Sequence, residues 1–289
     1  MEQGFVKVAS ATPRIRVADP VYNAQVICEQ AKEAAEHGAK IVVFPELCIT
    51  GYTCNDLFLQ ELLLEKAKEA LLTIAEETGQ LETLFLVGLP VDKDGRLYNV
   101  AAVLYRGRIL GMIPKKNIPM YAEFYEGRHF TPGEETVTEY RLGKQVIPFG
   151  SNLLFRCEEL PELILGCELC EDLWVAEPPS TSHALMGATV IANLSASNET
   201  VSKDDYRTLL IKASSARLLC GYIYTSAGEG ESTQDLVFGG HDLIAENGTL
   251  LVQSARFTTG ILYTDLDVLK ISSERRRMGT FGKRPMKPY

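Results

Sequence analysis

Two cysteines, Cys167 and Cys170, lie three residues apart at the end of the apolar run LILGCELCEDLW. Such a pair could clamp a metal ion, form a redox pair, or supply one nucleophile beside a packing residue. A zinc site usually needs a second pair of ligands, but the sequence has no other CxxC motif and its histidines stand far apart, at His37, His129, His183 and His241. The spacing therefore disfavours a metal site.

Acidic residues surround this pair of cysteines, namely Glu168, Glu171 and Asp172. A redox CxxC motif relies on positive charge and a helix N-terminus to stabilise its thiolate, so these neighbours argue against a redox pair. A thiol among carboxylates stays protonated unless a base and a fixed cation lie beside it. If one cysteine is a nucleophile, both groups have to come from elsewhere in the chain.

The two cysteines are expected to differ in role. Alternation along Leu163, Leu165, Cys167 and Leu169 places Cys167 on the apolar face of a strand, which is a packing position. Cys170 falls where the strand pattern breaks into CEDLW, a turn. A nucleophile at a tight junction between strand and turn projects its reactive atom away from the sheet. We therefore expect Cys167 to be structural and Cys170 to be reactive.

Glu46 is a candidate for the base. It follows the apolar strand pattern KIVVF, which Pro45 ends. An acid directly after a strand buried on both faces lies at the sheet edge in a low dielectric, where a carboxylate can serve as general base. The same position also suits a carboxylate that caps the chain or pairs with an arginine. This stretch alone does not separate the two roles.

Lys115 is the corresponding candidate for the cation. It follows the strand pattern RILGMIP, and Pro119 fixes the next turn. Adjacent residues that leave a strand face opposite ways, so Lys116 is expected in solvent. Most lysines are exposed, so Lys115 alone is a weak candidate for the cation. Its support comes from the shared pattern, because Glu46, Lys115 and Cys170 each follow an apolar strand.

The order Glu46, Lys115, Cys170 resembles the catalytic set of the nitrilase, or carbon-nitrogen hydrolase, superfamily. FPELCITGY, PKKNIPMYAEFYEGRHF and CEDLW stand where that superfamily has its three signatures, and the resemblance covers nearly the entire chain. Four stretches are similar to the N-terminal glutaminase domains of bacterial glutamine-dependent NAD synthetases, namely FVKVASATPRIRVADPVYN, FPELCITGYTCNDLF, NLSAS and ERRRMGTF. The resemblance implies a hydrolase in which Glu46 is the base, Lys115 stabilises an oxyanion, and Cys170 forms a γ-glutamyl thioester and releases ammonia.

The resemblance also implies roles for residues around this set. Glu123 matches the second glutamate of the superfamily, which positions the lysine and the substrate. Positions that hold glutamine in the NAD synthetase branch are matched by Tyr121, Glu171 and Ser197, and less closely by Trp174 and Lys203. For Tyr121 and Trp174, ordinary core packing is an equally open interpretation.

The domain organisation follows from the same resemblance. It predicts a hydrolase domain over residues 1–270 and a basic connector over 271–289 that leads to a synthetase domain, whose SGGxDS motif does not occur here. We expect no cofactor and no metal on the hydrolase domain. ATP, Mg²⁺ and deamido-NAD would be used only by the synthetase domain, and the superfamily implies a homo-oligomer. A stand-alone amidase or nitrilase for another small amide or nitrile, and a catalytically silent module, stay open as alternatives.

The elements that position these residues alternate between strands and helices. Apolar, β-branched runs predict strands at 5–11, 39–44, 84–91, 97–105, 162–169, 188–195, 221–227, 241–246, 249–254 and 260–267. Helical spacing predicts helices over 22–36, 57–78 and 203–221, the last capped by Asp204 and closed by Gly221.

Hairpins complete the predicted architecture. DKDGRLYNV, YRGRIL and AENGTLL each carry a residue before glycine between two apolar runs, where positive φ angles are tolerated. Hairpins beside helix-separated strands imply mixed sheets. Two such sheets covered outside by helices give an α/β fold. The resemblance implies that this fold is the nitrilase-like four-layer α-β-β-α sandwich.

Composition excludes several classes of protein. The net charge of -9 disfavours nucleic acid and anionic membrane as partners. No stretch has the roughly 18 apolar residues of a membrane span, and the N-terminus lacks a signal-peptide pattern, so we expect a cytoplasmic protein. The seven scattered cysteines do not form a disulfide framework.

Overall fold

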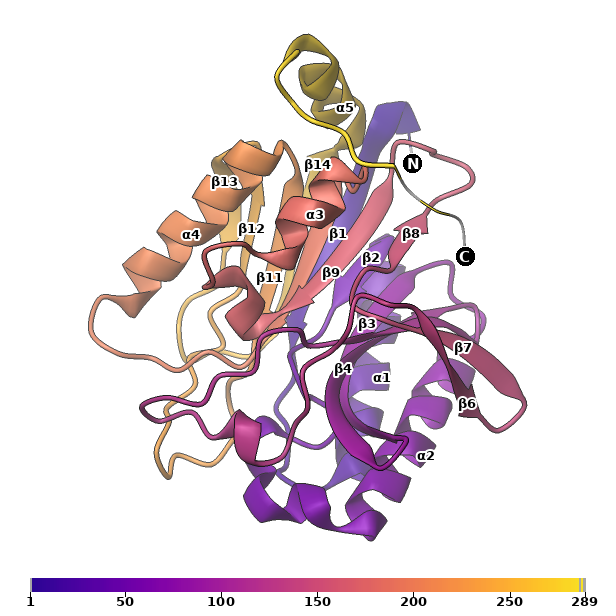
Figure 1. Ribbon diagram of the computed structural model, residues 1–289, viewed down its shortest axis with the longest axis vertical. Coiled ribbons are helices and arrows are strands. Elements are labelled where there is room, and N and C mark those ends of the chain that lie inside the picture. Colours follow the sequence, from indigo (N-terminus) through magenta and orange to yellow (C-terminus); the bar gives the residue numbers. More distant parts are fainter. Residues whose placement is uncertain (1, 286, 288–289) are drawn as a thin grey trace.

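Two mixed β-sheets stack face to face with helices on their outer sides (Figure 1). The computed structural model describes residues 2–285 and 287. The predicted α-β-β-α sandwich is confirmed. No helix within the described residues is long and apolar enough to cross a membrane.

The larger sheet has eight strands among the described residues. Their spatial order is β14 (Gly260–Asp267), β1 (Phe5–Thr12), β2 (Ile41–Val43), β3 (Leu84–Lys93), β4 (Arg96–Tyr105), β5 (Arg108–Pro114), β7 (Gln145–Phe149) and β6 (Thr138–Leu142). The central strands β1, β2 and β3 run parallel, whereas β3, β4 and β5 pair antiparallel through hairpins.

The smaller sheet has six strands, again counted over the described residues. Their order is β13 (Thr249–Gln253), β12 (Leu243–Glu246), β11 (Gly221–Ser226), β10 (Val190–Ser195), β9 (Ile164–Leu169) and β8 (Leu154–Arg156). Strands β9, β10 and β11 are parallel, and the outer strands are antiparallel. Both sheets are therefore mixed, as the hairpin signals predicted.

Helices cover the outer face of each sheet. Helices α1 (Pro20–Glu36) and α2 (Glu61–Glu77) pack on the larger sheet in one apolar cluster. On the smaller sheet lie α3 (Pro179–Leu185) and α4 (Lys203–Leu218). The remaining helical segments are α5 (Val268–Arg277) and the 3-10 turns η1 (Glu2–Gly4), η2 (Tyr52–Leu59), η3 (Glu126–Arg128) and η4 (Cys170–Leu173).

Another apolar cluster fills the space between the sheets. It joins the inward face of β1, β2 and β3 to the inward face of β9, β10 and β11. Cys167 belongs to this cluster with Leu163, Leu165 and Leu169, and it is 1% exposed. The packing position predicted for Cys167 is thus confirmed.

Two predicted helices differ in their limits. The helix expected over 57–78 is interrupted because Gln60 adopts an extended conformation, so that η2 and α2 are separate. Ser202 rather than Asp204 precedes α4, and Asp204 lies in its first turn, where a carboxylate interacts well with the helix dipole. The left-handed residue that ends α4 is Leu219, and Gly221 instead begins β11.

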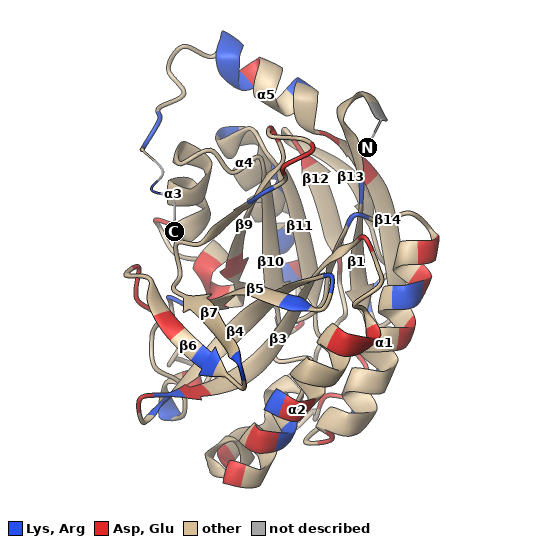
Figure 2. Cartoon of the chain, turned by 90° about the vertical axis from the view of Figure 1, so that its right-hand side faces the viewer, with Lys and Arg blue, Asp and Glu red and all other residues tan. Residues whose placement is uncertain are grey.

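The basic C-terminal segment is more ordered than its sequence suggested. Val268–Arg277 forms α5, with Val268 and Ile271 buried. Basic residues lie on α5 and the segment after it (Figure 2). The connector predicted over 271–289 therefore begins inside a packed helix. Its residues 286, 288 and 289 lie outside the described part of the chain, and its link to another domain stays a prediction.

Candidate active site

Three strand ends deliver the predicted catalytic residues to one place. Glu46 follows β2, Lys115 follows β5 and Cys170 follows β9. The ends of the two sheets also contact each other, since the Glu46 backbone N–H donates to the carbonyl of Ser195, 3.2 Å away at the end of β10. Residues 69 positions apart in sequence, Glu46 and Lys115, are thereby in direct contact.

Lys115 is held between two carboxylates. Its Nζ lies 2.7 Å from Glu46 Oε1 and 2.6 Å from Glu126 Oε1, and all three side chains are buried. Asn99 Nδ2 donates to Glu46 Oε1 at 2.6 Å, and Tyr52 Oη donates to Glu126 Oε1 at 2.9 Å. The second oxygen of Glu46, Oε2, is buried without a hydrogen-bond partner among the described residues.

The charges in this cluster depend on one another. Burial by itself lowers the pKa of Lys115, but the carboxylates of Glu126 and Glu46 outweigh burial, and the pKa lies well above its ordinary value. Burial raises the pKa of Glu126 to about 7, although Lys115 acts in the opposite direction. Lys115 is therefore a fixed cation, and Glu126 takes up a proton more readily than an ordinary glutamate.

The glutamate that contacts the lysine is not the one the resemblance indicated. Glu123 was expected to position Lys115, but Glu126 holds that contact. The Glu123 carboxylate instead accepts a hydrogen bond from Asn198. The two glutamates are separated by three positions in an irregular loop, where η3 begins at Glu126 and turns its side chain inward. The lysine-positioning role of Glu123 is thus corrected to Glu126.

Cys170 occupies the first position of η4, directly after β9. Its φ angle is +40°, in the left-handed region that residues with a side chain rarely adopt. The residue is 5% exposed. Burial and then the Glu46 carboxylate raise the pKa of the thiol, whereas Lys115 lowers it. Cys170 is therefore within electrostatic reach of both partners and is a protonated thiol at rest.

Tyr121 and Glu171 form a pair beside the nucleophile. Tyr121 Oη lies 3.0 Å from both carboxylate oxygens of Glu171, and Tyr121 itself is 55% exposed. Core packing, the alternative interpretation for Tyr121, does not fit this exposure. Burial raises the pKa of Glu171, which follows Cys170 in sequence.

Lys203, Trp174 and Ser197 lie in a second polar group. Lys203 Nζ is 5.1 Å from the centre of the Trp174 ring and donates to Asn198, the same residue that contacts Glu123. Ser197 is buried, and its hydroxyl accepts a hydrogen bond of 3.2 Å from Arg207.

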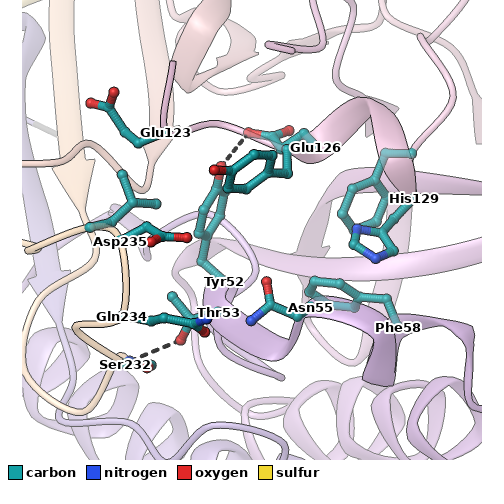
Figure 3. Close-up of a pocket in the computed structure, with 13 residues that line it drawn as sticks. Tyr52, Thr53, Asn55, Phe58, Glu123, Glu126, His129, Ser232, Gln234 and Asp235 are labelled. Carbon is teal, nitrogen blue, oxygen red and sulfur yellow. Dashed lines mark hydrogen bonds between the residues drawn. The ribbon is translucent and has the colours of Figure 1, made fainter. Parts of the chain in front are cut away.

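A pocket of about 50 Å³ adjoins the catalytic cluster. Figure 3 shows Tyr52 and Glu126 joined by a hydrogen bond in the wall of this pocket. Because Glu126 lines this pocket and also contacts Lys115, the pocket reaches the cluster from the side of the glutamate. Glu123 lines the same pocket.

Sequence reasoning missed three residues of the cluster, namely Glu126, Asn99 and Tyr52. Asn99 left a signal, because it is a polar residue inside the apolar strand run LYNVAAVLY. A buried amide requires hydrogen-bond partners, and here these are Glu46 and Glu126. Tyr52 and Glu126 lie in loops and turns, where no periodic pattern indicates which side chains point inward.

Comparisons with known proteins show the family of the chain. The model of the carbon-nitrogen hydrolase family matches residues 7–276. A glutamine-dependent NAD(+) synthetase of Mycobacterium bovis is 43% identical over 282 residues, which are 97% of this chain and 42% of that protein. One from Thermotoga maritima is 32% identical over 250 residues, 85% of this chain and 39% of that protein. The chain spans about two fifths of the length of these curated relatives.

Two solved structures share the fold over most of this chain. A glutamine-dependent NAD(+) synthetase from Cytophaga hutchinsonii superimposes with a TM-score of 0.82 at 28% identity, over 91% of this chain and 43% of that chain. An amidase from Nesterenkonia sp. superimposes with a TM-score of 0.71 over 96% of this chain and 97% of its own. At 21% identity, the likeness to the amidase concerns the fold alone.

Proposed function

The chain belongs to the carbon-nitrogen hydrolase family and is a hydrolase of carbon–nitrogen bonds, and from this premise we propose that it releases ammonia from the side-chain amide of glutamine. We also propose that it is the glutaminase part of a glutamine-dependent NAD synthetase. In that enzyme, a separate synthetase domain would use ATP and Mg²⁺ to amidate deamido-NAD with the ammonia. The glutamine-dependent NAD(+) synthetases of Mycobacterium bovis and Thermotoga maritima support both proposals.

The unpartnered oxygen of Glu46 carries the mechanistic proposal. Glu46 Oε1 is occupied by Lys115 and Asn99, whereas Oε2 is buried and has no partner in the described part of the chain. An orphaned buried carboxylate oxygen within electrostatic reach of a thiol is suited to accept its proton. Because the pKa of the Cys170 thiol is raised, we propose that the proton moves to Glu46 as the sulfur attacks the amide carbon.

The attack produces a tetrahedral intermediate with an oxyanion. The Lys115 ammonium supplies a preorganised positive charge for it, and removing one such donor typically costs about 3 kcal/mol. The Cys170 N–H already donates to Asn193, so a backbone donor for the oxyanion has to be a neighbouring N–H. Glu46 then returns its proton to the leaving nitrogen and ammonia departs. A water molecule, deprotonated by Glu46, finally cleaves the thioester to glutamate.

The charged groups beside Cys170 support glutamine over a simple amide. Free glutamine carries an ammonium and a carboxylate at its α-carbon. We propose that Glu171, oriented by Tyr121, binds the ammonium and that Lys203 binds the carboxylate. Trp174 would hold Lys203 in place through the face of its ring. A small aliphatic amide or nitrile would use neither charge.

Ammonia release from glutamine, acetamide and a simple nitrile tests this proposal. We expect glutamine to be the preferred substrate and Cys170→Ala to lower its turnover by roughly 1,000-fold or more. Cys157→Ala is the matched control, because Cys157 is only partly buried and lies outside the site. A preference for the simple amide or nitrile would instead indicate an amidase or nitrilase of the same family.

Labelling separates an enzyme from a silent module. Intact-mass analysis after treatment with 6-diazo-5-oxonorleucine, a glutamine-mimicking electrophile, should show a single adduct on the chain. The adduct should map to Cys170 and disappear in Cys170→Ala. A chain that stays unlabelled, and that releases no ammonia, contradicts the proposal.

A further inference from the structure

Three polar side chains lie behind Cys170 and outside the catalytic cluster. Glu168 is on β9, Asn193 on β10 and Tyr222 on β11, and each is fully buried. These strands are adjacent and parallel. A buried carboxylate and amide in the middle of a sheet are costly unless they are hydrogen-bonded, and the reaction described above uses none of the three.

The hydrogen bonds among these residues form a chain that starts at the nucleophile. The Cys170 N–H donates to Asn193 Oδ1 at 3.2 Å, and Asn193 Nδ2 donates to the Tyr222 hydroxyl at 3.2 Å. Tyr222 Oη then donates to Glu168 Oε1. The Ser180 N–H donates to the other oxygen of Glu168 at 2.8 Å.

The direction of these bonds is fixed by the groups at both ends. Asn193 Oδ1 accepts from Cys170 and also from the Ser195 hydroxyl at 2.7 Å, so the amide nitrogen has to face Tyr222. Because Tyr222 Oη accepts from that nitrogen, its own proton points to Glu168. A carboxylate, which only accepts, is the group that suits this end of the chain.

The conformation of Cys170 needs such support. A residue with a side chain at φ +40° is strained and persists only where its surroundings hold it. Its N–H is the atom to which the chain attaches. We propose that Glu168, Tyr222 and Asn193 are positioning residues that hold the Cys170 turn in its reactive conformation, an inference that rests on the proposed role of Cys170 as nucleophile.

Tyr222→Phe is the sharpest variant, because it keeps the ring and removes the middle link. We expect the kcat for ammonia release to fall tenfold or more, with KM within twofold of the parent chain. The rate of Cys170 alkylation by iodoacetamide, followed by peptide mass mapping, should fall by a similar factor. Tyr140→Phe is the matched control, since Tyr140 is a buried tyrosine on β6 of the other sheet.

Glu168→Gln tests the direction of the chain. Both partners of Glu168 donate, but an amide offers one acceptor and one donor, so the variant forces a mismatch. It should slow kcat and alkylation as Tyr222→Phe does, and it decides the question if Tyr222→Phe does not fold. Because the residues act as one chain, the double variant should be no slower than the slower single variant.

The outcomes separate this inference from the proposed function. The inference is overturned if Tyr222→Phe and Glu168→Gln fold and keep the kcat and the alkylation rate of the parent chain. It is also overturned if the decreases in kcat of the two single variants multiply in the double variant. If Cys170→Ala abolishes ammonia release while these variants do not, only the inference fails. If Cys170→Ala retains ammonia release, the proposed function itself fails.

Discussion

Lys115 shows how a single buried residue sets the charge balance of a site. It is fully buried, and its ammonium is retained only because Glu46 and Glu126 lie within 2.7 Å of Nζ. Removing one partner from a buried ion pair leaves an uncompensated charge. The lysine therefore stabilises the fold around the site in addition to the role proposed for it in the reaction.

Lys115→Met should destabilise the chain by about 3–5 kcal/mol near neutral pH, because two buried carboxylates lose their counterion. Burial already raises the pKa of Glu126 to about 7 with the lysine present, and loss of the lysine raises it further. When a carboxyl has a higher pKa in the folded state than in the unfolded state, the folded chain becomes less stable as pH rises. Urea unfolding should thus show a larger penalty at pH 8 than at pH 5.

The exposed neighbour provides the control for this prediction. Lys116 pairs with Glu135 at the surface, where an ion pair contributes roughly 0–1 kcal/mol. Lys116→Met should change the unfolding free energy little at either pH. An equal penalty for Lys115→Met at pH 5 and pH 8 would contradict the charge argument.

At this scale, sequence reasoning worked where a strand ended and failed inside loops. Glu46, Lys115 and Cys170 each follow an apolar run, so their positions at the sheet ends could be predicted. Glu126 could not be distinguished from Glu123, because the loop has no period that tells which side chain points inward. The contact with Lys115 depends on where η3 begins.

At the scale of the structural elements, polar side chains join the two sheets. Thr12 on β1 and Asp242, directly before β12, lie 2.9 Å apart, and Asp242 also accepts from the Ser226 N–H of β11. Thr12 donates in turn to the Ser226 carbonyl. Burial raises the pKa of Asp242 to about 7, even though Arg207 of α4 and the donors Ser226, Thr12 and Ser10 act against it.

Asp242→Asn should remove a pH dependence of stability. The folded-state pKa of about 7 exceeds the unfolded value of about 3.9, so the aspartate's contribution to stability falls as pH rises from about 4 to about 7, by on the order of 4 kcal/mol. Asparagine can accept from Ser226 and donate to Thr12 without ionising. In urea unfolding, the variant should gain stability over the parent chain at pH 8 but not at pH 4, and parallel curves would refute this.

Gly88 on β3 controls how closely the Glu46 loop approaches the sheet. A Cβ atom at this position would lie 2.3 Å from the Leu47 nitrogen and 2.6 Å from the Pro45 carbonyl oxygen. These atoms belong to the backbone and cannot rotate away. A side chain at Gly88 would therefore displace the segment that carries Glu46.

Gly88→Ala should lower the kcat for ammonia release tenfold or more, because small displacements of catalytic groups are costly, and should destabilise the chain by about 1–3 kcal/mol. Gly279→Ala is the control, since a Cβ at Gly279 meets no atom within 4 Å. Unchanged kinetics in Gly88→Ala would show that the Glu46 loop can move without losing its function.

Among the elements, strong local signals were the ones that could be predicted. The three residue-glycine steps adopt positive φ angles in hairpins, at Asp94 and Gly95, Arg106 and Gly107, and Asn247 and Gly248. The strands β6, β7 and β8 were missed, because they are short and only partly buried and their sequences alternate weakly. Strands β6 and β7 pair with each other as a hairpin across residues 143 and 144, where Gly143 has a φ angle of +58°.

At the scale of the whole molecule, the contacts of the C-terminal segment with the rest of the chain show where the folded unit ends. Arg275 donates to the carbonyls of Leu219 at 2.9 Å, Leu218 at 2.8 Å and Ala188 at 2.6 Å. Its guanidinium also lies 4.8 Å from the centre of the Phe281 ring. From the sequence, this arginine belonged to the predicted basic connector, and only the fold reveals its acceptors.

A chain that ends at residue 270, the predicted domain boundary, should be less stable than the full chain. It would expose the surface that Ile271 covers and leave the carbonyls at the end of α4 without a donor, and unsatisfied buried groups cost about 1–3 kcal/mol each. Arg275→Met should reproduce much of this loss, whereas Arg276→Met, at an exposed position, should not. If thermal unfolding places the shortened chain within 1 °C of the full chain, α5 is a connector and not part of the hydrolase fold; a clear drop in both the shortened chain and Arg275→Met extends the folded unit through α5.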